Sequence, residues 1–166
     1  SERDRQAGMA EAFKASGITI NSEEVSSADI NLEGGLGLWD DLVIRKAEGE
    51  LDYAMCANST NALGCLAASE SAGRTDYKVF GIDDEADQLA ALTKENGIYY
   101  ATVAQNPFEI GVRVMEAAVH AVEGQDDGIV KVDGILVTRD TVQEYVANRE
   151  KALEELKDYL AIITAS

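Results

Sequence analysis

One ten-residue segment near the middle of the chain organises the rest: Tyr77-Lys78-Val79-Phe80-Gly81-Ile82-Asp83-Asp84-Glu85-Ala86. Its first half is rich in β-branched and aromatic residues, which favours a short buried strand. Gly81 permits a close approach of the backbone, and the acidic residues 83–85 suit the N-cap and first turn of a helix. The segment therefore predicts a strand, a loop and a helix. Asp83 follows the carboxyl end of the strand, where ligands bind in open α/β sheets.

The same pattern occurs on both sides of this segment. Upstream, residues 51–56 predict a strand, 58–60 a loop and 62–71 a helix; downstream, residues 99–104 predict a third strand. Three consecutive strand ends then carry compact hydrogen-bonding side chains, none of them a nucleophile: Asn58, Asp83 and Gln105.

The remaining periodic segments complete an alternating pattern. They predict helices over residues 3–16, 31–46, 107–122 and 140–163 and short strands over 18–20 and 135–137. Trp39 lies in the apolar stripe of its helix, which predicts a core position, whereas Gly34, Gly35 and Gly37 are expected to weaken that helix and do not have the spacing of a phosphate loop. Together these elements predict an α/β fold with a doubly wound, mostly parallel sheet and right-handed crossovers, followed by a C-terminal helix.

Composition excludes several classes of partner. The chain has 166 residues, enough for one domain with its own core, and a formal net charge of −17. Such a charge disfavours nucleic acid and anionic membrane surfaces, which are bound through Lys and Arg. No apolar run approaches the ~20 residues of a membrane helix. We therefore expect no nucleic acid among the partners.

The groups that usually carry chemistry are sparse. Cys56 and Cys65 are expected to be buried thiols, with a disulfide between a strand and its following helix as the alternative. His120 is the one histidine, and it lies beside an apolar helical stripe, so a structural role is expected. These residues offer no metal-ligand spacing. The sequence predicts no catalytic residue, no metal site and no cofactor.

Four motifs in a fixed order connect the chain to a known family. They are Ala57-Asn58-Ser59-Thr60-Asn61-Ala62-Leu63-Gly64, Val79-Phe80-Gly81-Ile82-Asp83, Ala101-Thr102-Val103-Ala104-Gln105-Asn106-Pro107 and Asp133-Gly134-Ile135-Leu136-Val137-Thr138-Arg139-Asp140-Thr141-Val142. In this order the motifs resemble type 1 periplasmic sugar-binding proteins of ABC transporters, and the ribose-binding branch in particular. The resemblance extends from about Arg3 to Tyr145.

The resemblance implies the C-terminal lobe of a two-lobed clamp that closes on one monosaccharide. Residues 1–139 would form the lobe and residues 140–166 a helical extension. Carried over by position, Asp83 would bind two hydroxyls, Asn58 would be the loop asparagine and Gln105 the glutamine beside the hinge. Arg3 would grip ring or hydroxyl oxygens.

Two positions depart from the family pattern. Ile30 stands where the ribose branch places a stacking aromatic residue, so it would offer the sugar apolar contact only. Ser59 stands where a second acidic residue is common. These departures leave the identity of the sugar open.

The family also implies partners that lie outside this chain. The helix over 107–122 carries an apolar stripe, Val112, Met115, Val119 and Val122, which is expected to pack on a missing N-terminal lobe or on a second copy of the chain. An ABC permease or a receptor component in the membrane would read the closed clamp. The location would be periplasmic or extracellular, with a lipoprotein anchor in a Gram-positive host.

Three alternatives remain at this stage. The long helix over 140–163 suits the sensory ectodomain of a signalling receptor. The effector core of a sugar-responsive repressor shares the fold, but the acidic balance disfavours it. Residues 83–85 resemble the magnesium site of phosphoacceptor domains, although Gln105 occupies a strand end with no nearby Lys. A binding protein without enzymatic activity is the leading hypothesis.

Overall fold

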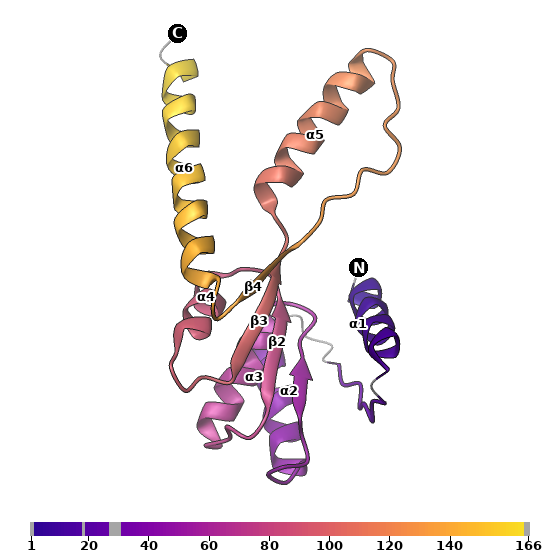
Figure 1. The fold of residues 1–166 in the computed structure, drawn as a ribbon, viewed down its shortest axis with the longest axis vertical. Coiled ribbons are helices and arrows are strands. Elements are labelled where there is room, and N and C mark those ends of the chain that lie inside the picture. Colours follow the sequence, from indigo (N-terminus) through magenta and orange to yellow (C-terminus); the bar gives the residue numbers. More distant parts are fainter. Residues whose placement is uncertain (1, 18, 27–30, 165–166) are drawn as a thin grey trace.

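A computed structural model describes residues 2–17, 19–26 and 31–164 of the chain. Figure 1 shows how the helices and strands of this part alternate along the sequence. In order they are α1 (Glu2–Ser16), α2 (Leu32–Arg45), β1 (Tyr53–Met55), α3 (Ser59–Ser71), β2 (Lys78–Ile82), α4 (Ala86–Thr93), β3 (Tyr99–Ala104), α5 (Pro107–Val122), β4 (Ile135–Thr138) and α6 (Val142–Thr164).

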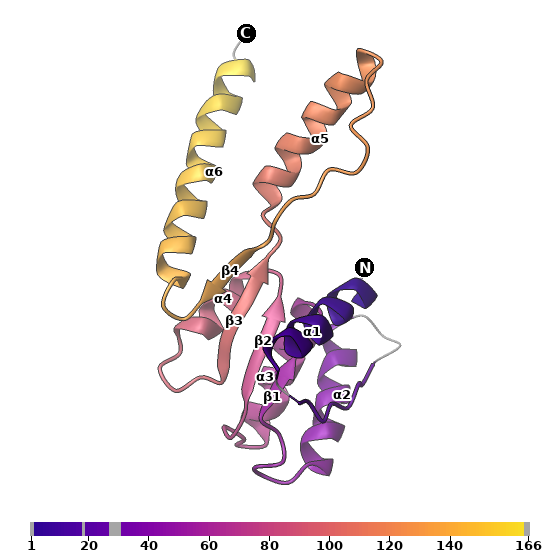
Figure 2. The same ribbon diagram turned by 45° about the vertical axis from the view of Figure 1, so that its right-hand side comes forward.

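The four strands form one mostly parallel sheet in the order β1-β2-β3-β4. The first three are parallel to one another, and β4 pairs antiparallel with β3. Since successive right-handed crossovers in one direction place their helices on one face, α3 and α4 cover the same side of the sheet. On the opposite side α1 lies against β1, where the rings of Phe13 and Tyr53 stack at 5.4 Å (Figure 2). The predicted fold class is confirmed.

The core lies between the sheet and the α3/α4 layer, and α2 packs on the outside of α3. Alternate strand residues face this core; among them Ala54, Val79 and Thr102 are buried. Trp39 of α2 is also buried, at 7% exposure, as its apolar stripe predicts. The three parallel strands are therefore anchored by this core along one face of the sheet.

Two glycines set the contact between α2 and α3. A Cβ atom on Gly64 would lie 2.6 Å from the backbone carbon of Gly35, and one on Gly35 would lie 2.8 Å from the carbonyl oxygen of Thr60. Backbone atoms cannot move aside as a flexible side chain can. Gly35 therefore has a second role beside its expected effect on helix stability, because it permits the helices to touch.

Two short strands predicted from the sequence differ in the structure. Thr19 and Ile20 belong to no strand, and Ile18 lies outside the described residues. The strand over 135–137 forms as β4, but it is not buried: Leu136 is 63% exposed, and only Val137 faces the core. β4 lies at the edge of the sheet, where one face of the strand has no helix to cover it.

Helices α5 and α6 extend away from the sheet (Figures 1 and 2). No residue of α5 is buried, and Val114, Met115 and Val122 are 61%, 65% and 89% exposed. The first turns of α6 pack on α4 and β4 through the buried Val142. Further along α6, Leu153 is 50% exposed.

The two cysteines lie in the core, and the histidine pairs with a nearby carboxylate. Cys56 and Cys65 are free and buried, and contact with the Cys65 thiol, together with burial, raises the pKa of Cys56. His120 Nδ1 lies 2.8 Å from a carboxylate oxygen of Asp127.

Within the described ranges, no cluster of His, Cys, Asp and Glu is arranged to hold a metal ion. A helix long and apolar enough to cross a membrane is likewise absent from that part of the chain.

Candidate functional site

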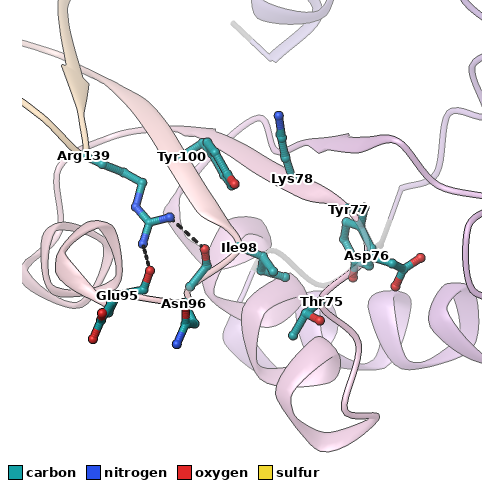
Figure 3. Close-up of a pocket in the computed structure, with 10 residues that line it drawn as sticks. Thr75, Asp76, Tyr77, Lys78, Glu95, Asn96, Ile98, Tyr100 and Arg139 are labelled. Carbon is teal, nitrogen blue, oxygen red and sulfur yellow. Dashed lines mark hydrogen bonds between the residues drawn. The ribbon is translucent and has the colours of Figure 1, made fainter.

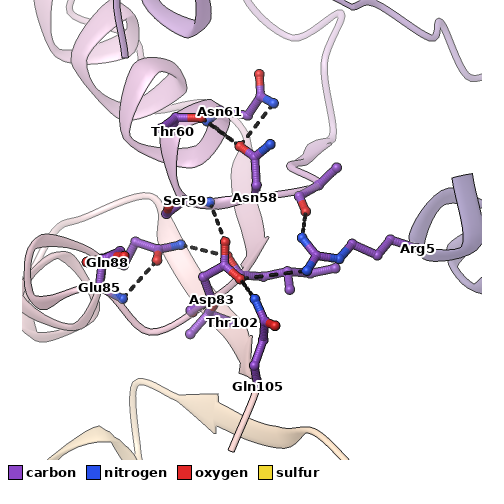
Figure 4. A network of polar contacts seen from close by, with 12 residues as sticks. Arg5, Asn58, Ser59, Thr60, Asn61, Asp83, Glu85, Gln88, Thr102 and Gln105 are labelled. Carbon is purple, nitrogen blue, oxygen red and sulfur yellow. Dashed lines mark hydrogen bonds and ion pairs between the residues drawn. The ribbon is translucent and has the colours of Figure 1, made fainter. Parts of the chain in front are cut away.

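A polar network lies at the carboxyl ends of β1, β2 and β3 (Figure 4). The residues that follow these strands, Asn58, Asp83 and Gln105, meet there because parallel neighbours end at the same edge of a sheet. The structure therefore brings together three of the side chains that the sequence analysis selected.

The Asp83 carboxylate is the centre of this network. Its Oδ2 atom accepts a hydrogen bond from the backbone N–H of Ser59 at 3.0 Å. Its Oδ1 atom accepts from Nε2 of Gln105 and lies 3.9 Å from Nη2 of Arg5. The side chain is only 16% exposed. A carboxylate has about four acceptor positions, so both oxygens retain acceptor capacity toward a ligand.

The Asp83 backbone has a conformation that few non-glycine residues adopt. Its φ angle is +83°, in the left-handed region. The Asp83 N–H donates to the carbonyl of Val103 at 2.9 Å, and the hydroxyl of Thr102 donates to the Asp83 carbonyl at 2.6 Å. Neighbouring β3 thus fixes both peptide groups of Asp83 and aims its carboxylate at the edge of the sheet.

Asn58 has a structural task in addition to its position at the edge. Its side-chain oxygen caps α3 by accepting from the backbone N–H of Asn61 at 2.9 Å and from the hydroxyl of Thr60 at 2.9 Å. This is the usual N-cap role of asparagine. The cap fixes the side chain, so its amide group is held at the rim in one orientation.

The positive charge next to Asp83 comes from Arg5, which the sequence analysis missed. Arg5 Nη1 donates to the carbonyl of Ala57 at 2.7 Å, which holds the guanidinium between the ends of β1 and β2. Arg3, the predicted residue, is exposed on α1. Residues two apart on a helix point in directions about 200° apart, and here Arg5 is the one that reaches Asp83. Ile30, also predicted, lies outside the described residues.

Two buried polar side chains, Gln88 and Tyr99, hold the loop between β2 and α4. Gln88 is fully buried, and its Nε2 donates to the carbonyl of Ile82 at 3.1 Å and to the Tyr99 hydroxyl at 2.8 Å. Its Oε1 accepts from the backbone N–H of Glu85 at 3.1 Å, which completes a capping box at the start of α4. Burial raises the pKa of Tyr99 to about 12, so this hydroxyl stays protonated at neutral pH.

The combination of groups suits a ligand with several hydroxyls. A hydroxyl both donates and accepts, so it can donate to Asp83 and accept from the fork of Arg5 or from an amide of Asn58 or Gln105. These residues include no nucleophile paired with a base.

An open cavity of about 370 Å³ lies at the opposite, amino-terminal ends of the parallel strands (Figure 3). It contains the Tyr100 ring, with the Lys78 ammonium 5.0 Å and the Arg139 guanidinium 5.3 Å from the ring centroid. Arg139 also donates to backbone carbonyls at the end of α4: Lys94, Glu95 and Gly97. These bonds satisfy carbonyls of the C-cap and of the loop between α4 and β3, so Arg139 has a structural role at this end.

Comparison with known proteins identifies the family. A family model described as a periplasmic binding protein domain matches residues 1–126. The chain belongs to this family. Ribose import binding protein RbsB from Salmonella typhimurium and from Escherichia coli are each 29% identical to this periplasmic binding protein domain over 123 residues, 74% of the chain. The resemblance to type 1 periplasmic sugar-binding proteins is thereby confirmed.

Solved structures agree on the fold. A solute-binding protein of an ABC transporter from Agrobacterium vitis, with bound allitol, superposes with a TM-score of 0.76 at 20% identity, over 87% of this chain and 51% of its own. One from Bacillus halodurans, with bound myo-inositol, has a TM-score of 0.70 at 27% identity, over 86% of this chain and 48% of its own. The chain spans 40% of the length of the curated relatives that it matches.

Proposed function

We propose that this periplasmic binding protein domain is one lobe of a clamp that captures a small, neutral, polyhydroxylated ligand, a monosaccharide or a related polyol. Residues 1–139 form the lobe, and residues 140–166 form a helical extension. The protein works outside the cytoplasm and delivers its ligand to an ABC permease without changing it chemically. Relatives named for ribose import, and solved relatives with bound polyols, support this ligand class.

The observation that carries the proposal is the Asp83 carboxylate. It is largely enclosed, its oxygens face donors at one rim, and acceptor capacity remains on both oxygens. Two adjacent sugar hydroxyls match this arrangement, and a charged acceptor makes each hydrogen bond stronger than a neutral one. Arg5 supplies the donor fork in this proposal. Arg3 and Ile30 remain predictions from the family resemblance.

Calorimetric titration of the intact clamp that contains this chain tests the function. A panel of pentoses, hexoses and polyols such as allitol and myo-inositol should include at least one ligand that binds in a 1:1 ratio. Carboxylated sugar acids should bind more weakly than the neutral sugars, because their charge would face Asp83. A panel in which only acidic or only apolar compounds bind would contradict the proposal.

We further propose that α5 is covered in the intact protein by a second lobe. The helix has no buried residue, and large apolar side chains are exposed on it: Phe108 at 59%, Met115 at 65% and Val119 at 53%. An apolar face of this extent on a single helix promotes association. The chain covers 51% and 48% of two solved relatives, and in this proposal the counterpart of their uncovered part buries the α5 face.

The exposed α5 face predicts how the isolated chain sediments. Residues 1–166 alone should form dimers or larger species in analytical ultracentrifugation, because the apolar side chains bury each other when no second lobe is present. Val119→Glu should shift the distribution toward monomer. The matched control, Gln125→Glu, adds the same charge at an exposed polar position and should leave it unchanged. A wild-type chain that sediments as a clean monomer would reject the proposal.

A further inference from the structure

The loop that carries Asp83 is held from a second side, by the distant helix α6. Asp84, the next residue, is 13% exposed, and its Oδ2 atom accepts from the Tyr145 hydroxyl at 2.7 Å. The same carboxylate lies 3.0 Å from Nη1 of Arg149, which also donates to the backbone carbonyl of Asp84 at 3.0 Å. Two side chains of α6 therefore grip both the side chain and the backbone of one loop residue.

The contacts of Tyr145 and Arg149 with Asp84 lie next to a residue with an unfavourable backbone conformation. Asp83 has a φ angle of +83°, and such a conformation persists in a non-glycine residue only when its surroundings hold it. On one side β3 binds the peptide groups of Asp83 through Val103 and Thr102. On the other side Arg149 of α6 donates to the carbonyl of the following peptide, whose N–H donates to Gln88 of α4. The contacts from β3 and those from α6 therefore hold the backbone on both sides of the turn at Asp83 and Asp84, which we call the Asp83–Asp84 bend.

The base of α6 is itself firmly placed. Val142, in its first turn, is 1% exposed, and α6 packs on both α4 and β4. Burial, followed by the Asp84 carboxylate, raises the pKa of Tyr145 to about 12, so its hydroxyl remains a donor at neutral pH. Figure 1 shows that the rest of α6 extends away from the sheet, so its contacts with the lobe are concentrated at this end.

We propose that Tyr145 and Arg149 are positioning residues for ligand recognition, because they hold Asp84 and thereby keep the Asp83 carboxylate aimed at the ligand. This inference deepens the proposed function and rests on it for the identity of the ligand. Neither residue contacts the ligand; both act through the Asp83–Asp84 bend. Because such coupling is reciprocal, a bound ligand also strengthens the attachment of α6 to the lobe.

Amide hydrogen exchange of the intact clamp tests this inference before any sugar is added. The Ser59 amide reports the Asp83 carboxylate, to which it donates, and the Asp83 amide reports the bend. In Arg149→Met both amides should exchange about tenfold faster than in wild type, because the loss of a charged hydrogen bond raises the frequency of local opening. Tyr145→Phe, which removes only the hydroxyl, should produce a smaller increase at the same two amides.

The control is Lys151→Met, which removes a positive charge from an exposed position on the same helix. It should leave exchange at Ser59 and Asp83 unchanged. Arg149→Lys should restore part of the protection, since an ammonium can pair with the carboxylate but does not offer the planar fork of arginine. Exchange in Arg149→Met equal to that in Lys151→Met would overturn the inference.

Affinity supplies the second measurement. For the sugar that binds wild type best, Arg149→Met should raise the dissociation constant about tenfold, with Lys151→Met unchanged. Faster exchange with an unchanged affinity would overturn the positioning role. If no sugar binds the wild type, the proposed function fails, while the exchange measurement still decides whether α6 holds the bend.

Discussion

Asp83→Ala should weaken ligand binding by about a hundredfold or more. Two hydrogen bonds from sugar hydroxyls to the carboxylate are lost, and bonds to a charged group contribute about 1.5–3 kcal/mol each. A total of about 3 kcal/mol corresponds to a factor of somewhat over 100 in the dissociation constant. Isothermal titration calorimetry of the intact clamp with its best sugar measures this loss directly.

Two further variants separate recognition from folding. Asn tolerates the left-handed conformation of Asp83 better than Ala does, so Asp83→Asn preserves the bend while it removes the charge. It should bind with intermediate affinity. Asp87→Ala removes an exposed carboxylate from the first turn of α4 and should bind as wild type does. Equal affinities for Asp83→Ala and Asp87→Ala would show that Asp83 does not contact the ligand.

Gly64→Ala should reduce the free energy of unfolding by about 2 kcal/mol or more, although alanine is the better helix former. The added Cβ would lie 2.6 Å from the Gly35 carbon and 2.7 Å from the Leu36 nitrogen. Both are backbone atoms, so α2 and α3 must move apart, and the core beneath them loses contacts. Urea denaturation followed by circular dichroism measures the change.

Gly37→Ala is the matched control on the facing helix. A Cβ at this exposed position meets nothing within 4 Å. The substitution should therefore stabilise the chain by about 0.5–1 kcal/mol, since alanine loses less backbone entropy on folding. Identical midpoints for the two variants would mean that the helices are not in close contact at Gly64.

The elements with strong local signals were predictable from the sequence. β3 and α5 have the predicted bounds, because a β-rich run ends at a polar pair and proline then opens the helix. The positions of Asn58, Asp83 and Gln105 followed from the general rule that parallel strands carry ligand-binding groups at their carboxyl ends. A short strand, a loop and a polar residue are local features, and they recur three times here.

Contacts between distant segments were not predictable in this way. Which arginine of α1 reaches Asp83 depends on how the helix is rotated against the sheet, and that rotation leaves no trace in the spacing of Arg3 and Arg5. Thr19 and Ile20 have the composition of a strand, but they pair with none of the strands in the described part of the chain. The pairing of Asp84 with Arg149 joins residues 65 positions apart. One charged residue among several on a long helix carries no signal for such a partner.

The connection between the sheet and α5 has a mechanical consequence. The chain leaves the sheet at Ala104 and returns at Ile135, and these two residues pair in the antiparallel ladder of β3 and β4. In the proposed clamp, a second lobe joined to the sheet through both β3 and β4 would rotate mainly about one axis across this strand pair. A lobe joined through one strand only could rotate about any axis. In the proposed clamp this double connection would restrict the orientation of the second lobe before a ligand binds. Closure over the ligand would then cost little entropy, and more of the contact free energy would remain for affinity.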